Sequence, residues 1–343
     1  MRSENDDLRY GYLEASDWPI IILRGKLMNK VLITTPTFAR YSPSALQLLQ
    51  DAGLEVVRTT QGVATEADVL KCIDNDVVAI IAGLEPITKA VIASAPALKV
   101  VAKHGIGVDN IDLGEAKARG IRVVNAPGTN AEAVADLVFA LMLCTARRLP
   151  DAATRLRAGE WPRVIGRQVW GATLGIVGLG MIGKAVARRA RGFNMTLLAY
   201  DPYFDQEFAH SNEIRQASLD EILTQSDFVT LHMPYSEETK NLIGEKELKK
   251  MKPSAFLINA ARGGVVDEAA LLHALSNKTI LGAAIDAFSK EPPVGTPFLN
   301  LSNVVCTPHM GAYTEEALQL TSEFAAKMVL DVLAGNRPKC TIV

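Results

Sequence analysis

From residue 30 onward, short runs of apolar and β-branched residues alternate with stretches whose apolar positions follow a helical period. This alternation is typical of parallel strand-helix units in an α/β protein. The first series predicts strands at 30–35, 54–58, 77–82, 99–103 and 121–125, with helices at 44–52 and 88–94. These elements are sufficient for a small α/β domain that ends before residue 126.

A second series begins at Thr173 and predicts strands at 174–177, 195–200, 228–232, 255–259, 279–285 and 304–306. Ser218 and Glu221 have the spacing of a capping box. A long helix over 131–147, with Asn130 as its N-cap, precedes this series. The stretch 149–170 has weak periodicity, which indicates a connecting segment. The last helix, over 314–334, follows a finished sheet, so we expect it to return to the first domain.

The pattern therefore predicts two domains, one of them discontinuous in sequence. One domain comprises 126–307, and the other comprises 28–125 with 308–343. Residues 1–27 have no apolar stretch typical of a secretory signal, and a strand follows Met28 almost at once. We expect residues 1–27 to be an extension outside the fold.

Composition excludes several classes of protein. The 343 residues are 48% hydrophobic with a formal charge of only -2, as expected for a soluble globular protein with a large core. No apolar run reaches the roughly 20 residues of a membrane helix. The four cysteines lack CxxC spacing, so we expect buried thiols in a reducing, cytoplasmic setting and no zinc site or other metal. The basic cluster 188–191 is interpreted as a solvated helix face, not as a nucleic-acid contact.

The segment 178–183, Gly-Leu-Gly-Met-Ile-Gly, lies between a predicted strand and a predicted helix. In a dinucleotide site, Gly178 permits the tight turn, Gly180 lets the backbone approach the pyrophosphate, and Gly183 brings helix and strand together. Asp201 follows the next strand, where a carboxylate accepts hydrogen bonds from ribose hydroxyls and repels a 2'-phosphate. We therefore expect NAD in preference to NADP. A loop carboxylate or helix cap is the alternative for Asp201.

Parallel strands gather the residues that follow them at one edge of the sheet, where ligands bind. Six candidates fall at or just after predicted strand ends: Gly178, Asp201, Pro234, Arg262, Asp286 and His309. We expect these residues to share one edge.

Five stretches of the sequence, 104–112, 178–183, 259–267, 285–292 and 307–311, together resemble the D-isomer-specific 2-hydroxyacid dehydrogenase family. This family includes D-3-phosphoglycerate dehydrogenases, glyoxylate/hydroxypyruvate reductases and a corepressor branch. The resemblance covers nearly everything from Met28 onward. It implies that 126–307 is a Rossmann NAD-binding domain and that 28–125 with 308–343 is a smaller flavodoxin-like α/β substrate domain.

By this resemblance, His309 is the general acid and base, which suits an imidazole because it titrates near neutral pH. Glu291 would hold the imidazole and favour its charged form. Arg262 would bind the substrate carboxylate and polarise the carbonyl, using a planar fork that lysine lacks. The structural alternatives are a loop position for His309 and an ion pair with Asp267 for Arg262.

The resemblance also assigns the remaining contacts. Asp286 would orient the nicotinamide carboxamide, with a capping or turn role as the alternative. Ile106 and Gly107 would receive the substrate carboxylate. Lys103 is a further candidate substrate contact, which could compensate for a missing arginine at a phosphate, with a solvated lysine as the alternative. The other cofactor contacts implied are Met181, Ile182, Pro234, Ala260, Ala261 and Gly311.

The predicted activity is interconversion of a small D-2-hydroxy acid and its 2-keto acid, of the D-3-phosphoglycerate or the hydroxypyruvate/glyoxylate type. A phosphorylated substrate needs a cation near its phosphate, but the segment 82–86 contains no arginine for this role and does contain the acidic Glu85. An NAD-sensing, corepressor-like protein with little turnover remains the alternative. The amphipathic pattern over 131–147 suggests a homodimer.

Overall fold

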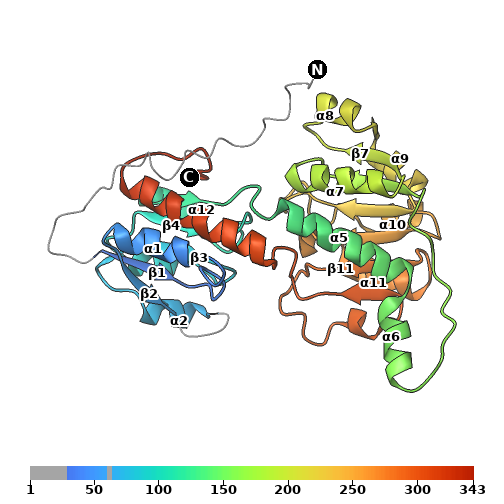
Figure 1. Cartoon of the computed structure of the whole chain (residues 1–343), viewed down its shortest axis with the longest axis horizontal. Helices are drawn as coiled ribbons and strands as arrows, with labels where there is room; N and C mark the ends of the chain where they lie inside the picture. The colour runs from blue at the N-terminus through green and yellow to red at the C-terminus, as the bar shows by residue number, and fades with distance from the viewer. Residues whose placement is uncertain (1–28, 60–63) are drawn as a thin grey trace. The chain divides into compact units, whose positions relative to one another are not determined.

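A computed structural model describes residues 29–59 and 64–343, so the extension expected over 1–27 lies outside the described part. The chain divides into two compact units (Figure 1). The small unit contains the described residues up to 104, with 108–125 and 325–343, and the large unit contains 105–107 and 126–324. The second division falls inside helix α12 (Glu315–Leu333), whereas the sequence placed a crossing at 307–308. The roles assigned to the two domains stay predictions.

The small unit is built on a five-stranded sheet of order β2-β1-β3-β4-β5, with every pair parallel. This is the doubly wound order of flavodoxin-like folds. The strands are β1 (Lys30–Ile33), β2 (Glu55–Arg58), β3 (Val77–Ala82), β4 (Val100–Lys103) and β5 (Arg122–Val124). The helices between them are α1 (Pro43–Asp51), α2 (Glu66–Lys71), α3 (Lys89–Ser94) and α4 (Leu113–Ala118).

Alternate residues of these strands pack on opposite faces, as expected for a sheet covered on both sides. Val31 and Ile33 pack with α1 and with the end of α12, whereas Leu32 and Ile80 pack with α2 and α3. The smaller flavodoxin-like α/β fold expected from the sequence is therefore confirmed.

The large unit is built on a seven-stranded parallel sheet of order β12-β11-β10-β9-β6-β7-β8. The chain winds outward from β6 through β8 and then returns to β9 on the other side of β6. This reversal between β6 and β9 is the switch point of a Rossmann fold, which confirms the predicted class. The strands are β6 (Thr173–Val177), β7 (Thr196–Tyr200), β8 (Ile214–Gln216), β9 (Phe228–Leu231), β10 (Phe256–Asn259), β11 (Gly282–Ile285) and β12 (Val304–Cys306).

Helices cover both faces of this sheet (Figure 1). The first face carries α5 (Ala131–Ala146), α7 (Met181–Gly192) and α8 (Gln206–Ser211), and the second carries α9 (Leu219–Gln225), α10 (Glu245–Lys250) and α11 (Glu268–Ser276). The short helices η2 (Gly263–Val265) and η3 (Pro297–Asn300) lie in the loops after β10 and β11. Ser218 and Glu221 form the predicted capping box of α9.

Three local features differ from what the sequence predicted. The segment expected to be a plain connection begins with helix α6 (Leu149–Arg157), which has no buried residue and therefore no core-facing stripe in the sequence. Strand β8 was missed because it has three residues and two of them are exposed. Asn130 occupies the N-cap position of α5 as predicted, but its side chain makes no capping hydrogen bond, and its Oδ1 is buried without a partner in the described chain.

The four cysteines are free and half-buried, so the expectation of fully buried thiols was wrong. Burial nevertheless raises the pKa of the Cys306 thiol to about 11. The basic cluster on α7 also differs from a freely solvated face, because Arg189 binds Glu132 and Asp136 of α5. No helix of the described residues is long and apolar enough to cross a membrane.

Candidate active site

Two of the three glycines in the turn after β6 are packed so closely that a side chain would not fit there. Gly178 has a φ of 98°, and a Cβ there would lie 2.8 Å from the carbonyl carbon of His232. A Cβ on Gly183 would overlap the carbonyl oxygen of Gly178. A Cβ on Gly180, in contrast, would meet nothing within 4 Å. The backbone at Gly180 is therefore open to a ligand.

Helix α7 begins directly after Gly180, and no side chain caps its N-terminus. The unpaired N-H groups of a first helical turn, together with the helix dipole, favour an anionic group. Met181 is exposed, and Ile182 is partly buried against the core. The turn therefore fits a dinucleotide pyrophosphate.

Asp201 follows β7 and links the glycine turn to the next loop. Its Oδ2 accepts a hydrogen bond from the N-H of Leu179 at 2.7 Å, and its Oδ1 accepts one from Tyr203 at 2.7 Å. Each carboxylate oxygen keeps a second lone pair for a ribose hydroxyl. An open hollow beside it is lined by Tyr200, Asp201, Gln216, Ala217, Ser218 and Glu221. Because this lining contains no cation, it fits a plain ribose better than a 2'-phosphate.

Asn259 shapes the turn after β10. Its amide Nδ2 donates to the carbonyl of Arg262 at 3.0 Å, and its Oδ1 accepts from the N-H of Ala261 at 3.1 Å. These two bonds close a loop over Ala260 and Ala261. The Arg262 guanidinium donates from Nη1 to the carbonyl of Ala261 at 2.8 Å. A guanidinium carries five N-H donors in a planar fork.

Gly263 brings the β10 loop against the β11 loop. A Cβ on Gly263 would overlap the carbonyl group of Phe288 and the nitrogen of Ser289. Ser289 N-H donates to Glu268 Oε1 at 2.6 Å, and Phe288 N-H donates to Glu291 Oε1 at 3.0 Å. The loop that carries Glu291 is thus held against the turn that carries Arg262.

Asp286, which is 2% exposed, anchors the loop that carries His309. Its Oδ1 accepts from Thr307 Oγ1 at 2.7 Å and from the Met310 N-H at 2.9 Å. Its Oδ2 accepts from the Gly311 N-H at 3.0 Å. The turn role that the sequence left as an alternative is therefore present, and contact with a nicotinamide stays a prediction.

His309 and Glu291 form a close pair. His309 Nδ1 lies 2.8 Å from Glu291 Oε2 and 2.9 Å from Oε1, and both side chains are about one-third exposed. Burial by itself would raise the pKa of Glu291, but hydrogen bonds from His309 and the Phe288 N-H, with the charges of His309 and Arg262, lower it below its usual value. The backbone of His309 has a φ of 50°, in the left-handed region that non-glycine residues seldom adopt. Such strain is typical of functional positions.

The remaining predicted residues are distributed over both units. Pro234 follows β9 and accepts at its carbonyl from Thr239 Oγ1 at 2.7 Å. Ile106 and Gly107 belong to the large unit, whereas Lys103 belongs to the small one. Lys103 is not solvated: it is 4% exposed, and its Nζ donates to Asn110 Oδ1 at 2.7 Å and to the carbonyl of Gly83.

Glu85 is also buried in the small unit, where its carboxylate accepts from Thr34 Oγ1 and the Gly83 N-H. The carboxylate is turned into the protein.

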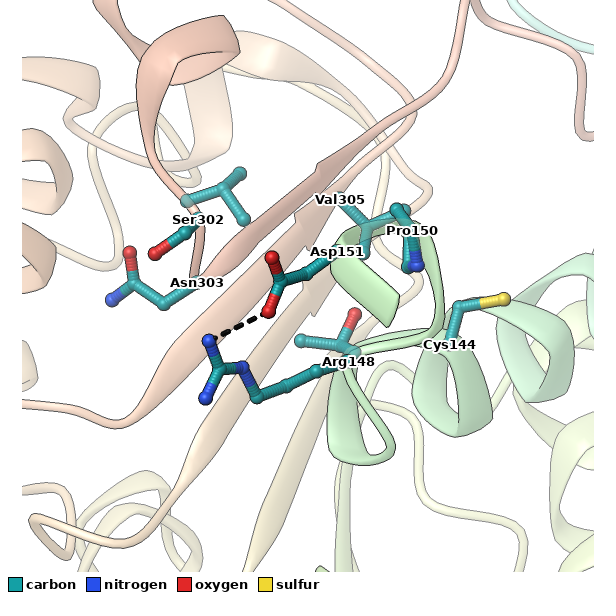
Figure 2. Close-up of a pocket in the computed structure, with 9 residues that line it drawn as sticks. Cys144, Arg148, Pro150, Asp151, Ser302, Asn303 and Val305 are labelled. Carbon is teal, nitrogen blue, oxygen red and sulfur yellow. Dashed lines mark hydrogen bonds and ion pairs between the residues drawn. The ribbon is translucent and has the colours of Figure 1, made fainter. Parts of the chain in front are cut away.

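The hollow drawn in Figure 2 lies away from the glycine turn and the His309–Glu291 pair. Its lining joins the α5–α6 junction to residues 302–305, at the amino end of β12, and Arg148 and Asp151 of this lining form an ion pair of 2.8 Å. The amino ends of parallel strands lie at the edge opposite the glycine turn, so this hollow is not part of the candidate site. Within 29–59 and 64–343, no group of three or more His, Cys, Asp or Glu side chains is arranged to hold a metal ion.

Comparison with known proteins agrees with this geometry. Residues 139–311 match the family described as D-isomer specific 2-hydroxyacid dehydrogenase, NAD binding domain. A glyoxylate reductase of Korarchaeum cryptofilum is 42% identical over 74% of this chain and 79% of its own. The chain belongs to the D-isomer specific 2-hydroxyacid dehydrogenase family and carries its NAD-binding domain.

Two further relatives are informative. A D-3-phosphoglycerate dehydrogenase of Methanocaldococcus jannaschii is 40% identical over 90% of this chain, which spans 58% of the length of that relative. The structure of D-lactate dehydrogenase from Aquifex aeolicus, complexed with NAD and lactic acid, is 29% identical with a TM-score of 0.77. It covers 89% of this chain and 96% of its own.

Sequence reasoning missed two contributors to the site. Gly263 lies within the stretch 259–267 but was given no role of its own, although the loop contact depends on it. Tyr235 packs its ring over Gly264, where a Cβ would lie 2.5 Å from the ring. No spacing or charge pattern indicates this contact, because it joins the loops after β9 and β10.

Proposed function

We propose that this protein is an NAD-dependent oxidoreductase that interconverts a small D-2-hydroxy acid and its 2-keto acid by hydride transfer. The observation that carries the proposal is the His309–Glu291 pair, 2.8 Å apart, in a chain with the family's NAD-binding domain. When bound, NAD would accept the hydride in oxidation of the hydroxy acid, and NADH would donate it in reduction of the keto acid. The residues of this chain bind the acid, orient it and move one proton.

His309 is the general acid and base. Glu291 engages Nδ1, so Nε2 is the nitrogen that exchanges a proton with the substrate oxygen. In reduction, the imidazolium protonates the forming alkoxide, and in oxidation the neutral ring removes the hydroxyl proton. Glu291 fixes the orientation of the ring. Because the pKa of Glu291 is lowered, its carboxylate is ionised at neutral pH and stabilises the imidazolium of His309.

Arg262 binds the substrate carboxylate and polarises the reacting carbonyl. Its planar fork suits a carboxylate in two-point contact. The backbone N-H groups of Ile106 and Gly107 are the further donors that we assign to the same carboxylate. Lys103 is buried and bound to Asn110 and Gly83, so we assign it no direct contact with this carboxylate. Asp286 holds the His309 loop and, in this proposal, faces the nicotinamide carboxamide.

The substrate is a small 2-keto acid of the hydroxypyruvate, glyoxylate or phosphohydroxypyruvate type. Relatives are named for both glyoxylate and D-3-phosphoglycerate. The unphosphorylated acids are favoured, because 82–86 contains no arginine that could bind a phosphate. The Glu85 carboxylate is buried and therefore does not bear on this choice.

We also propose a cytoplasmic homodimer. The sequence argument rested on 131–147, but Val134, Val138 and Leu141 are buried in the core of the large unit. The better support is the stretch between α6 and β6, where Trp161 is 85% and Ile165 is 88% exposed. Light scattering of the purified chain tests this: a monomer at micromolar concentration would contradict it.

The activity is tested by steady-state turnover with a panel of acids, hydroxypyruvate, glyoxylate, pyruvate and phosphohydroxypyruvate, each with NADH and with NADPH. We expect at least one acid to be reduced at about 1 s⁻¹ or faster with NADH, within the ordinary range of enzymes. Tight NADH binding with far slower turnover on every acid would contradict the proposal and favour an NAD-sensing protein.

A further inference from the structure

His232 occupies the switch point of the large sheet. It is the first residue after β9, and its N-H donates to the carbonyl of Val177, the last residue of β6, at 2.8 Å. A Cβ on Gly178 would lie 2.8 Å from the carbonyl carbon of His232. The residue therefore borders the crevice where ligands of such sheets bind.

The two nitrogens of its ring have different surroundings. Nε2 lies 2.9 Å from Thr230 Oγ1, within a strand whose residues are all buried. Nδ1 is buried and has no hydrogen-bond partner among the residues that the structure describes. Buried polar atoms of native proteins are nearly always paired, with protein, water or a ligand. An unpaired ring nitrogen at this edge calls for such a partner.

The imidazole is neutral. Burial lowers the pKa of His232 to about 3, so the ring is uncharged at physiological pH. It therefore neither attracts a phosphate as a cation nor takes part in the proton transfer assigned to His309. What it offers is one directional hydrogen bond beside the glycine turn.

We propose that His232 is a cofactor-positioning residue, whose Nδ1 hydrogen-bonds to the bound dinucleotide directly or through one water that the dinucleotide holds. The proposal rests on the NAD-binding role of the site. Thr230 fixes the ring through Nε2, and this fixes the direction of Nδ1. Bound cofactor supplies the partner that Nδ1 lacks.

Two substitutions separate this role from simple packing. In His232→Asn the amide has a polar atom near the place of Nδ1, whereas in His232→Gln the polar atoms lie closer to the place of Nε2. The measurement is the Kd of NADH, by fluorescence titration without substrate. We expect about a tenfold weaker Kd for His232→Gln, and a change of about threefold or less for His232→Asn. His273→Gln, at an exposed position of α11, is the control and should leave the Kd unchanged.

Equal NADH affinity of His232→Gln and the wild type would overturn the proposal, as would equal weakening by both substitutions. Absence of NADH binding by the wild type would overturn the cofactor assignment itself, and is thus a distinguishable failure.

A second measurement needs no folded variant at position 232. The ¹⁵N resonances of the histidine rings are recorded for the wild type with and without NAD. We expect the Nδ1 resonance of His232 to shift when NAD is added and its Nε2 resonance to shift less. An unchanged Nδ1 resonance at saturating NAD would refute the contact.

Discussion

Gly263 lies against the backbone of Phe288, so that a Cβ at position 263 would overlap the carbonyl group of Phe288. One loop carries Arg262 and the other carries Glu291, which holds His309. The absence of a side chain at this one position therefore sets how closely the carboxylate-binding group and the acid-base pair approach. The contact is between backbones, so no other residue type reproduces it.

Gly263→Ala should displace the Glu291 loop and lower kcat/KM by about 10²-fold, the loss typical of misplacing a catalytic group by about 1 Å. Stability should fall by roughly 1 to 3 kcal/mol, as in other overpacked sites. Steady-state kinetics and thermal unfolding measure the two effects. Gly192→Ala is the matched control, because a Cβ there meets nothing within 4 Å. Full activity of Gly263→Ala would show that the loops adjust freely.

Asp201 should set the choice between NAD and NADP. Asp201→Ala combined with Pro202→Arg removes the carboxylate that repels a 2'-phosphate and adds a cation beside the ribose site. We expect the ratio of kcat/KM for NADH to that for NADPH to fall by about tenfold or more. A tenfold change corresponds to a free-energy difference of about 1.4 kcal/mol. Pro202→Arg alone is the control. An unchanged ratio in the double variant would remove Asp201 from the ribose site.

The pair of Glu291 and His309 should stabilise the folded chain to an extent that depends on pH. The pKa of Glu291 is lower in the folded chain than in the unfolded chain, so its contribution is present above the unfolded value of about 4.3 and is lost as pH falls through the folded value. The difference in Tm between the wild type and Glu291→Gln should therefore be largest near pH 7 and shrink below about pH 4.3. A difference that stays constant from pH 7 to pH 3.5 would contradict the ionised pair.

Asp286→Asn should loosen the His309 loop. An amide cannot accept from both sides of this carboxylate, so one of the N-H groups of Met310 and Gly311 would face a donor. We expect a loss of about 1 to 3 kcal/mol in the free energy of unfolding, as for an unsatisfied buried group, with a lower kcat. Urea unfolding measures the free energy of unfolding, and steady-state kinetics measure kcat. A normal unfolding free energy with a raised Kd for NAD would instead indicate that Asp286 acts mainly on the cofactor.

The sequence predicted the architecture because its signals are periodic and local. Buried strands such as β3 and β9 appear as continuous apolar runs, and Ser218 with Glu221 marks a helix start. The elements that escaped have no such signal: α6 buries nothing against its own chain, and β8 is a short edge strand.

The site divides in the same way. His309, Glu291 and Arg262 were predicted from their residue types and from a family resemblance, and the structure brings Glu291 and His309 within hydrogen-bond distance. The support around them could not be read from the sequence. Gly263 against Phe288, and Tyr235 over Gly264, are contacts between loops that follow different strands. The orphaned Nδ1 of His232 likewise depends on three-dimensional packing, which no spacing encodes.

The central claim is that His309 supplies the proton in hydride transfer. The most direct test is the single-turnover rate of NADH oxidation by a 2-keto acid that the wild type reduces, measured for the wild type and His309→Ala at saturating NADH. We predict a rate lower by about 10²- to 10⁴-fold, the usual contribution of a general acid, with the Kd of NADH unchanged. A rate within a few-fold of the wild type would contradict the account.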